Sequence, residues 1–194
     1  LQEAWTAYRA GSLPIGAVVV NGAGEIIGRG RNRTREAEGQ PLAGNRMAHA
    51  EVNALLSADF KAHRPEGCTL YASTEPCPLC VGAAVMSNVK RIAYASRDPW
   101  AGASDLLQAS DYMRRQQVQA IPPQNAELEE ALVAIQVAWH LRAGAERAQP
   151  VLDAWAAIVP RGVERGRALW SGGTLDGWAQ AGDEISAVLD RMAA

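Results

Sequence analysis

The chain places three metal-binding side chains and one carboxylate in a pattern suited to catalysis at a zinc ion. His49 and Glu51 are separated by one residue, and Cys77 follows His49 by 28 positions in the segment Pro76-Cys77-Pro78-Leu79-Cys80. A catalytic zinc takes three protein ligands, typically imidazole and thiolate, and leaves its fourth position to water. Such an ion lowers the pKa of its water to about 7. The residues therefore predict hydrolysis by an activated water.

Each of these side chains has an expected role. Two cysteines separated by two residues at the start of a helix can direct both sulfurs toward one ion, and the helix N-terminus favours the thiolate form. Glu51 lies close enough to His49 to flank the water without replacing it. It would accept a proton from that water and then pass protons to the substrate.

The Cys-x-x-Cys segment alone would also fit a structural zinc knuckle or a redox pair. A structural zinc site normally has four protein ligands, and the chain holds only three cysteines and three histidines. Cys68 opens an apolar run and is expected in the core. His63 lies in a polar stretch and His140 follows an apolar helical run, so a surface position and a packing role are expected for them. A three-ligand site beside an acid therefore favours catalysis.

These motifs resemble those of the cytidine deaminase-like superfamily, most closely the branch with tRNA adenosine deaminases, guanine deaminases and fungal-type cytosine deaminases. Residues 14–20 and 27–33 resemble its first two core strands, and residues 74–83 resemble the entrance to its zinc helix. The resemblance extends over about residues 1–143. It implies an α/β fold, three-layer α/β/α with a mixed five-stranded sheet, and Zn²⁺ as cofactor. The implied reaction removes an amino group from a purine or pyrimidine and releases ammonia.

The resemblance also implies roles for site residues. His49, Cys77 and Cys80 would bind zinc, and Glu51 would be catalytic. Asn32 would hydrogen-bond the base or sugar, with Ala48 beside it in the substrate pocket, and the Cys77 backbone N–H would help to hold the water or a substrate oxygen. Asn32 could equally be a turn-former after a strand. Met47 stands where the family often has Thr, which affects the substrate contacts expected there and leaves the zinc chemistry unchanged.

Residues 96–102 follow the fourth expected strand, where the resembled families build a wall of the substrate pocket. Trp100 could stack on a base, and Asp98 could accept a hydrogen bond from an exocyclic amine. A tight turn at Asp98 and a packed aromatic at Trp100 are the alternatives.

The elements that must position these residues alternate between strands and helices, which indicates a mixed or parallel sheet flanked by helices. Strands are expected at 15–20, 25–30, 69–72, 91–95 and 117–121, and helices at 2–10, 48–58, 78–87 and 127–142. In the helix over 48–58 we expect Val52, Leu55 and Leu56 to be buried. Ligands of such sheets bind at the carboxyl ends of the strands, where both metal motifs would meet.

Two regions are expected, a zinc-dependent deaminase domain over residues 1–143 and a helical C-terminal extension over residues 144–194. Within the extension, residues 151–159 and 183–192 have helical periodicity, and the loop 171–173 separates them. The sequence leaves open whether the extension is a cap over the core, an oligomer contact or a substrate lid.

Charge favours a small substrate. Residues 1–100 hold 11 basic and 9 acidic side chains and residues 101–194 hold 8 and 12, so the net charges of +2 and −4 sum to the −2 of the whole chain. Nucleic-acid binding calls for a basic face. The alternating Arg29, Arg31, Arg33 and Arg35 could contact phosphate or form a solvated strand end. We therefore expect a free nucleobase or nucleoside, cytosine-type before guanine-type because residues 28–32 resemble the fungal-type enzymes.

The alternative is a tRNA-specific adenosine deaminase that forms inosine at the wobble position. A catalytically silent subunit or scaffold is a third hypothesis, and Glu51 argues against it. Composition predicts one well-buried domain with an appendage, without a membrane span or signal peptide. Three cysteines, two of them metal ligands, fit the reducing cytoplasm. Residue 1 is not Met, which leaves the native N-terminus open. A homo-oligomer, most simply a dimer, is expected from the resembled families.

Overall fold

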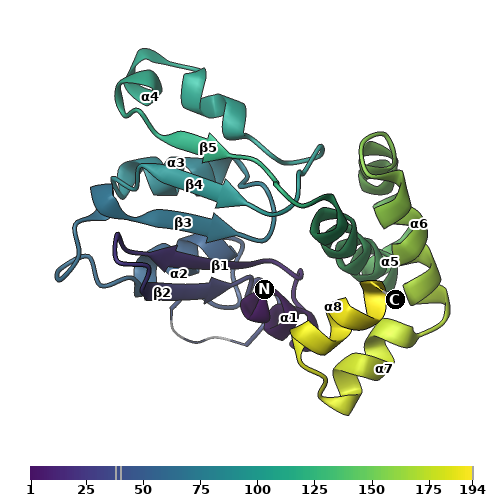
Figure 1. Ribbon diagram of the computed structural model, residues 1–194. Coiled ribbons are helices and arrows are strands. Elements are labelled where there is room, and N and C mark those ends of the chain that lie inside the picture. Colours follow the sequence, from purple (N-terminus) through teal and green to yellow (C-terminus); the bar gives the residue numbers. More distant parts are fainter. Residues whose placement is uncertain (38, 40, 194) are drawn as a thin grey trace.

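A mixed five-stranded sheet forms the centre of the computed structural model, which describes residues 1–37, 39 and 41–193 (Figure 1). Its strands are β1 (Gly16–Val20), β2 (Ile26–Arg31), β3 (Thr69–Ala72), β4 (Arg91–Tyr94) and β5 (Gln119–Ile121). Their order is β2-β1-β3-β4-β5. Strand β1 is antiparallel to β2 and β3, whereas β3, β4 and β5 run parallel. The predicted mixed sheet is confirmed.

Helices α2 (Ala50–Ser57) and α3 (Pro78–Met86) cover one face of this sheet (Figure 1). Strand side chains alternate between the two faces, so Val19 and Leu70 point toward these helices and are fully buried with Val81 and Ile92. Cys68 lies in the same core cluster, as expected. This packing fixes the two helices whose first residues adjoin the metal motifs.

Helix α2 approaches strand β2 closely because the strand carries glycine at two alternate positions. A Cβ atom at Gly30 would lie 2.2 Å from the Ala50 carbonyl oxygen, and one at Gly28 would lie 2.5 Å from that of Ala54. The buried face of α2 therefore carries small side chains. The prediction that Leu56 is buried was wrong: its side chain is 60% exposed, because it lies away from this alanine face.

Two polar side chains of α2 bind the outer edge of β2. The Ser57 hydroxyl accepts a hydrogen bond from the Arg29 N–H (2.9 Å) and donates to the Arg29 carbonyl (2.8 Å). The buried Asn53 donates to the Arg31 carbonyl (3.1 Å), and its own oxygen accepts from the Leu42 N–H (2.7 Å). Asn53 thereby ties part of the long loop before α2 to the strand.

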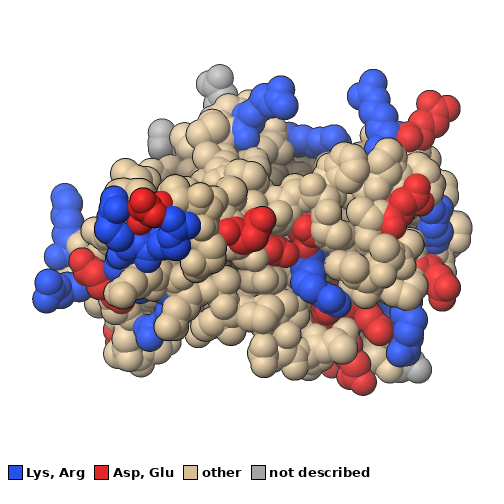
Figure 2. Space-filling model, turned by 90° about the horizontal axis from the view of Figure 1, so that it is seen from above, with Lys and Arg blue, Asp and Glu red and all other residues tan. Residues whose placement is uncertain are grey.

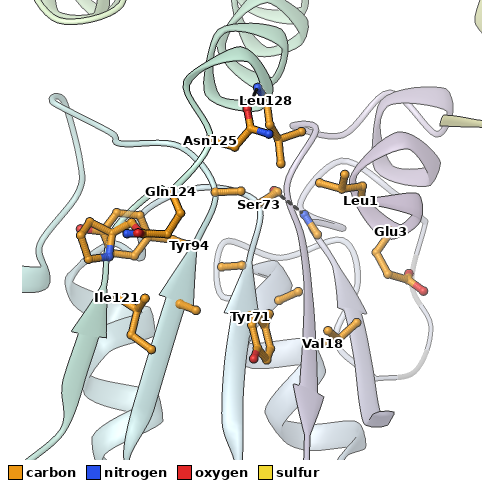
Figure 3. Close-up of a pocket in the computed structure, with 16 residues that line it drawn as sticks. Leu1, Glu3, Val18, Tyr71, Ser73, Tyr94, Ile121, Gln124, Asn125 and Leu128 are labelled. Atoms are coloured by element: carbon orange, nitrogen blue, oxygen red, sulfur yellow. Dashed lines mark hydrogen bonds between the residues drawn. The ribbon is translucent and has the colours of Figure 1, made fainter. Parts of the chain in front are cut away.

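The opposite face of the sheet carries an apolar groove of about 410 Å³ (Figure 3). It is lined from the strands by Val18, Tyr71, Tyr94 and Ile121, and from the start of helix α5 (Ala126–Ala156) by Leu128. Helix α1 (Gln2–Arg9) lies at its border through Glu3. The groove is thus separated by the sheet from the helices that carry the metal motifs.

The remaining elements lie mostly toward the C-terminus. They are η1 (Pro65–Gly67), η2 (Ser104–Gln108), α4 (Asp111–Arg115), α5 (Ala126–Ala156), α6 (Pro160–Ser171), α7 (Thr174–Ala181) and α8 (Ile185–Ala193). Helix α5 continues well beyond the predicted end at Arg142 and is interrupted at Gly144, which adopts φ 148°. The helix predicted over 151–159 was wrong in its bounds, because α5 ends at Ala156 and Val159 is the N-cap of α6. Helices α6 and α7 were not predicted.

Two apolar clusters hold the C-terminal helices together. One joins both parts of α5 to α6 and contains Val133, Val137, Leu141, Ala148, Leu152, Trp155, Val159 and Val163. The other joins α1 to α5, α7 and α8 through residues that include Trp5, Tyr8, Trp139, Leu175 and Val188. The division of the chain at residue 143 stays a prediction. Within residues 1–37, 39 and 41–193, no helix combines the length and apolar character that crossing a membrane requires.

Candidate metal centre and active site

The predicted metal ligands converge in space. One potential ligand atom from each of His49, Cys77 and Cys80 lies within 4.8 Å of the other two. The His49 Nδ1 atom is 3.5 Å from each sulfur, and the two sulfurs are 3.6 Å apart. One imidazole and two thiols at this separation match the nitrogen and sulfur donor set of a catalytic zinc. The residues therefore fit a zinc ion.

The starts of two helices position these ligands. His49 is the N-cap of α2, and Cys77 is the N-cap of α3, where Pro78 occupies the first helical position. The hydrogen bond between Cys77 and Cys80, followed by the one with His49, lowers the pKa of the Cys77 thiol to about 4. The same pairing with Cys77 raises the pKa of Cys80. Both sulfurs bind a metal as thiolates, so a divalent cation would displace the protons that they still hold.

Glu51 lies beside the ligands in a nearly dry environment. Its side chain is 4% exposed, and its Oε2 atom accepts a hydrogen bond from the Cys80 sulfur at 3.2 Å. Burial raises the pKa of this carboxyl above its usual value. A carboxyl that gains and loses a proton closer to neutral pH is suited to general acid–base catalysis.

Asn32 follows β2 and is 3% exposed. Its side-chain oxygen accepts hydrogen bonds from the Thr34 N–H (3.2 Å) and hydroxyl (2.8 Å), which is the turn-forming role considered above. The adjacent Arg33 N–H donates to the Ala48 carbonyl at 2.9 Å, so Asn32 is tied to the residue before His49. The Asn32 Nδ2 atom makes no hydrogen bond to any residue that the structure describes. Substrate roles for Asn32 and the buried Ala48 stay predictions.

Asp98 and Trp100 lie in the turn after β4. The Asp98 Oδ1 atom accepts hydrogen bonds from the backbone N–H groups of Trp100 and Ala101, both at 3.0 Å. Burial raises the pKa of Asp98, and the nearby charges of Glu75 and Cys77 raise it further. The Trp100 side chain is 59% exposed, so it is not a packed core aromatic. Their contacts with a substrate stay predictions.

Glu75 joins this turn to the cysteine loop, a role that the sequence analysis missed. Its Oε1 atom accepts from the Ser104 hydroxyl at 2.5 Å, and its Oε2 atom accepts from the Asp98 N–H at 3.3 Å. A Cβ atom at Gly102 would lie 2.6 Å from the Glu75 Cδ atom, so the turn packs tightly on this carboxylate. The position of Glu75 directly before Pro76 and Cys77 is the sequence feature that could have indicated this role.

The arginine stripe is largely occupied by internal contacts. Arg31 and Arg33 both form ion pairs with Glu36 at 2.9 Å. The Arg35 guanidinium lies 4.5 Å from the ring centre of Trp139. On the face drawn in Figure 2, basic and acidic side chains are interspersed, and a group of basic side chains around an acidic one lies over α4. The described contacts thus favour the strand-end interpretation of the stripe.

Comparison with known proteins agrees with this geometry. Residues 1–96 match the family described as the cytidine and deoxycytidylate deaminase zinc-binding region. A diaminohydroxyphosphoribosylaminopyrimidine deaminase/5-amino-6-(5-phosphoribosylamino)uracil reductase from Thermotoga maritima has a similar structure. Its TM-score is 0.53 at 25% sequence identity, and the match covers 75% of this chain and 40% of that chain. The sheet, its flanking helices and the three ligands therefore belong to one known architecture.

Two curated relatives match this chain over about half of its length. The tRNA-specific adenosine deaminase of Bacillus subtilis is 41% identical over 109 residues, which are 55% of this chain and 63% of that protein. The tRNA(Ile)-lysidine synthase of Deinococcus radiodurans is 45% identical over 101 residues, which are 49% of this chain and 16% of that protein. The chain thus spans less than two thirds of the length of either relative.

Proposed function

Because this chain belongs, through residues 1–96, to the family of the cytidine and deoxycytidylate deaminase zinc-binding region, we propose that it deaminates adenosine to inosine in a tRNA. The observation that carries the proposal is the convergence of His49, Cys77 and Cys80 beside the buried Glu51. The choice of substrate is supported by the 41% identity to the tRNA-specific adenosine deaminase of Bacillus subtilis. Charge alone favours a free nucleobase or nucleoside over tRNA, and the identity to this relative reverses that order.

The proposed reaction converts adenosine and water to inosine and ammonia. Zinc, when bound by the three ligands, supplies a water that ionises near neutral pH. The Glu51 carboxylate accepts a proton, delivers a proton to a ring nitrogen, and then assists protonation of the departing amine. Its burial beside the ligands suits this cycle, because the raised pKa lets one carboxyl both accept and donate.

The proposed pocket is completed by side chains around the metal. The Asn32 Nδ2 atom is available to donate to the base or sugar. The exposed ring of Trp100 offers a surface on which an unstacked base can lie, as enzymes that act on a single base require. Asp98 holds the turn that carries Trp100 and can accept from an exocyclic amine only through an oxygen not already bonded to the turn.

Deamination of a free nucleobase or nucleoside is the second candidate, with cytosine-type and guanine-type bases first. The net charge of −2 and the pairing of Arg31 and Arg33 with Glu36 favour it, because tRNA binding depends on neutralisation of phosphates. The face drawn in Figure 2 likewise carries basic and acidic side chains interspersed, without a continuous basic surface.

A substrate panel separates these candidates. The zinc-loaded protein would be incubated with an anticodon stem-loop carrying adenosine at the wobble position, and with free adenosine, adenine, cytosine, cytidine and guanine. Inosine in the stem-loop, measured by mass spectrometry, supports the proposal, and binding should weaken steeply with salt. Faster ammonia release from a free base would favour the second candidate. No turnover of any substrate by protein with full zinc content would reject both.

A further inference from the structure

The turn after β4, residues 97–103, is held from two directions. On the metal side, Glu75 accepts a hydrogen bond from the Asp98 N–H at 3.3 Å, and Glu75 lies two residues before the ligand Cys77. On the other side lie α5 and the C-terminal helices. Because Asp98 and Trp100 both lie in this turn, whatever fixes the turn also fixes the proposed substrate-facing wall.

Helix α5 holds Arg97 through its first turns. Glu129 accepts hydrogen bonds from the Arg97 backbone N–H (2.9 Å), Nε (2.8 Å) and Nη2 (2.9 Å). Burial alone would raise the pKa of Glu129, but these bonds to Arg97 lower it, so the carboxylate stays charged. One nearly buried carboxylate thereby binds both the side chain and the main chain of the residue that opens the turn.

The second contact comes from beyond the break at Gly144. Trp155 is 1% exposed, and its indole N–H donates to the Arg97 carbonyl at 3.1 Å. A buried indole N–H needs an acceptor, and this one belongs to the peptide group that joins Arg97 to Asp98. The N–H of the same peptide group binds Glu75. The peptide group is therefore fixed at one end by the C-terminal helices and at the other by the metal-binding loop.

We propose that Trp155, together with Glu129, is a positioning residue that sets the wall of the substrate pocket through the Arg97–Asp98 peptide group. The C-terminal helices then take part in substrate recognition, although neither residue contacts the metal ligands. The surrounding cluster of Leu152, Val159 and Val163 keeps the indole ring in place. The proposal rests on the proposed deaminase activity for its functional part and on the described hydrogen bonds for its structural part.

The test replaces Trp155 by Phe, which removes the indole N–H and keeps an aromatic ring. Loss of one hydrogen bond should raise KM for the accepted substrate about fivefold to tenfold, with kcat nearly unchanged. Amide hydrogen exchange of residues 97–103 should accelerate by a similar factor, while exchange in α2 and α3 stays as in the wild type. Trp170→Phe is the matched control, because that ring is 44% exposed in the same helical region and should change neither quantity.

The exchange measurement needs no substrate, so it separates this proposal from the proposed function. Unchanged exchange of residues 97–103 in Trp155→Phe would overturn the positioning role, whatever the activity. Faster exchange would support it even if the wild-type protein accepted no substrate in the panel. Should Trp155→Phe fail to fold, Glu129→Gln loosens the same turn from α5. Its exchange over residues 97–103 should accelerate, and unchanged exchange there would reject the proposal.

Discussion

The metal-binding region and the C-terminal helices differ in how far apart in the sequence their interacting residues lie. The ligands His49 and Cys80 are separated by 31 positions, and two short motifs contain all the chemically active groups. Trp155 and Arg97 are 58 positions apart in the sequence, and no motif predicts the hydrogen bond between them. Reactive groups are thus encoded locally in the sequence, whereas the shape of the pocket wall depends on long-range packing.

The two regions also have separate apolar cores. Residues of β1, β3, β4, α2 and α3 share one cluster, whereas the C-terminal helices share two others, one of which also includes Trp5 and Tyr8 of α1. The regions meet at the apolar contacts of α1 with α5, α7 and α8, and at polar contacts that include those of Glu129, Gln136 and Trp155. Because the core that holds α2 and α3 shares no residue with the cluster between α5 and α6, damage to that cluster should leave zinc binding intact.

The largest effect is expected at the metal. Glu51→Gln removes the proton-transfer group and keeps its shape, so turnover should fall about 10²-fold to 10⁴-fold while zinc remains bound. Steady-state kinetics and metal analysis measure the two quantities. Cys77→Ser is the control that should lose zinc as well. Full turnover by Glu51→Gln would show that the carboxyl does not carry the proton.

A buried leucine in the C-terminal helices tests whether their packing is independent of zinc binding. Leu152 is fully buried in the cluster between α5 and α6, and Leu152→Ala should lower the free energy of unfolding by about 2–5 kcal/mol. Zinc content of the folded variant should not change. Urea denaturation with metal analysis checks both, and the exposed Leu56→Ala should shift stability by less than about 0.5 kcal/mol. Zinc loss from folded Leu152→Ala would show that the regions are one unit.

Acid should weaken the helical region through His140. This ring contacts Trp139 and Trp155, and burial, followed by the charge of Arg35, lowers its pKa to about 4. In the unfolded chain His140 binds a proton near pH 6.5, whereas in the folded chain it stays neutral down to about pH 4. The free energy of unfolding therefore falls as the pH drops from about 6.5 to about 4. Across this pH range, the free energy of unfolding of His140→Leu should fall by about 2–3 kcal/mol less than that of the wild type. Parallel curves from denaturation at several pH values would contradict the assignment.

The smallest effect is expected at the surface between α5 and α6. Arg161 and Glu130 approach to 3.6 Å, but the arginine side chain is largely exposed. Such a pair contributes between 0 and about 1 kcal/mol. Glu130→Gln should therefore leave the midpoint of thermal unfolding almost unchanged. A loss comparable to that of Leu152→Ala would mean that this pair, and not the apolar cluster, joins the two helices.

The metal site could be predicted because its groups follow from residue type and spacing. His49, Cys77 and Cys80 lie where the motifs place them, and Glu51 is buried beside them. Leu56 was misjudged because hydrophobicity identifies an apolar side chain but not the close approach of a helix to a glycine-bearing strand. Glu75 was missed because its partners, Ser104 and Asp98, lie more than twenty positions away.

The C-terminal helices were harder to predict for a physical reason. Gly162 and Gly166 suggest poor helix formation, yet they lie inside α6. A Cβ atom at Gly166 would lie 2.7 Å from the Ala134 carbonyl oxygen, so glycine permits α6 to approach α5. The cost in helix propensity is offset by packing that only the tertiary structure reveals. Periodicity within one segment contains no information on that partner.

The hydrogen bonds from Ser57 and Asn53 to strand β2 have a consequence for self-association. An outer strand with free N–H and C=O groups can recruit a strand from another molecule. At Arg29 both outward groups are already bonded to Ser57, and the Arg31 carbonyl is bonded to Asn53. A neighbouring chain would have to displace helix α2 before it could extend the sheet there. Joining two copies into one continuous sheet through this part of β2 is therefore disfavoured.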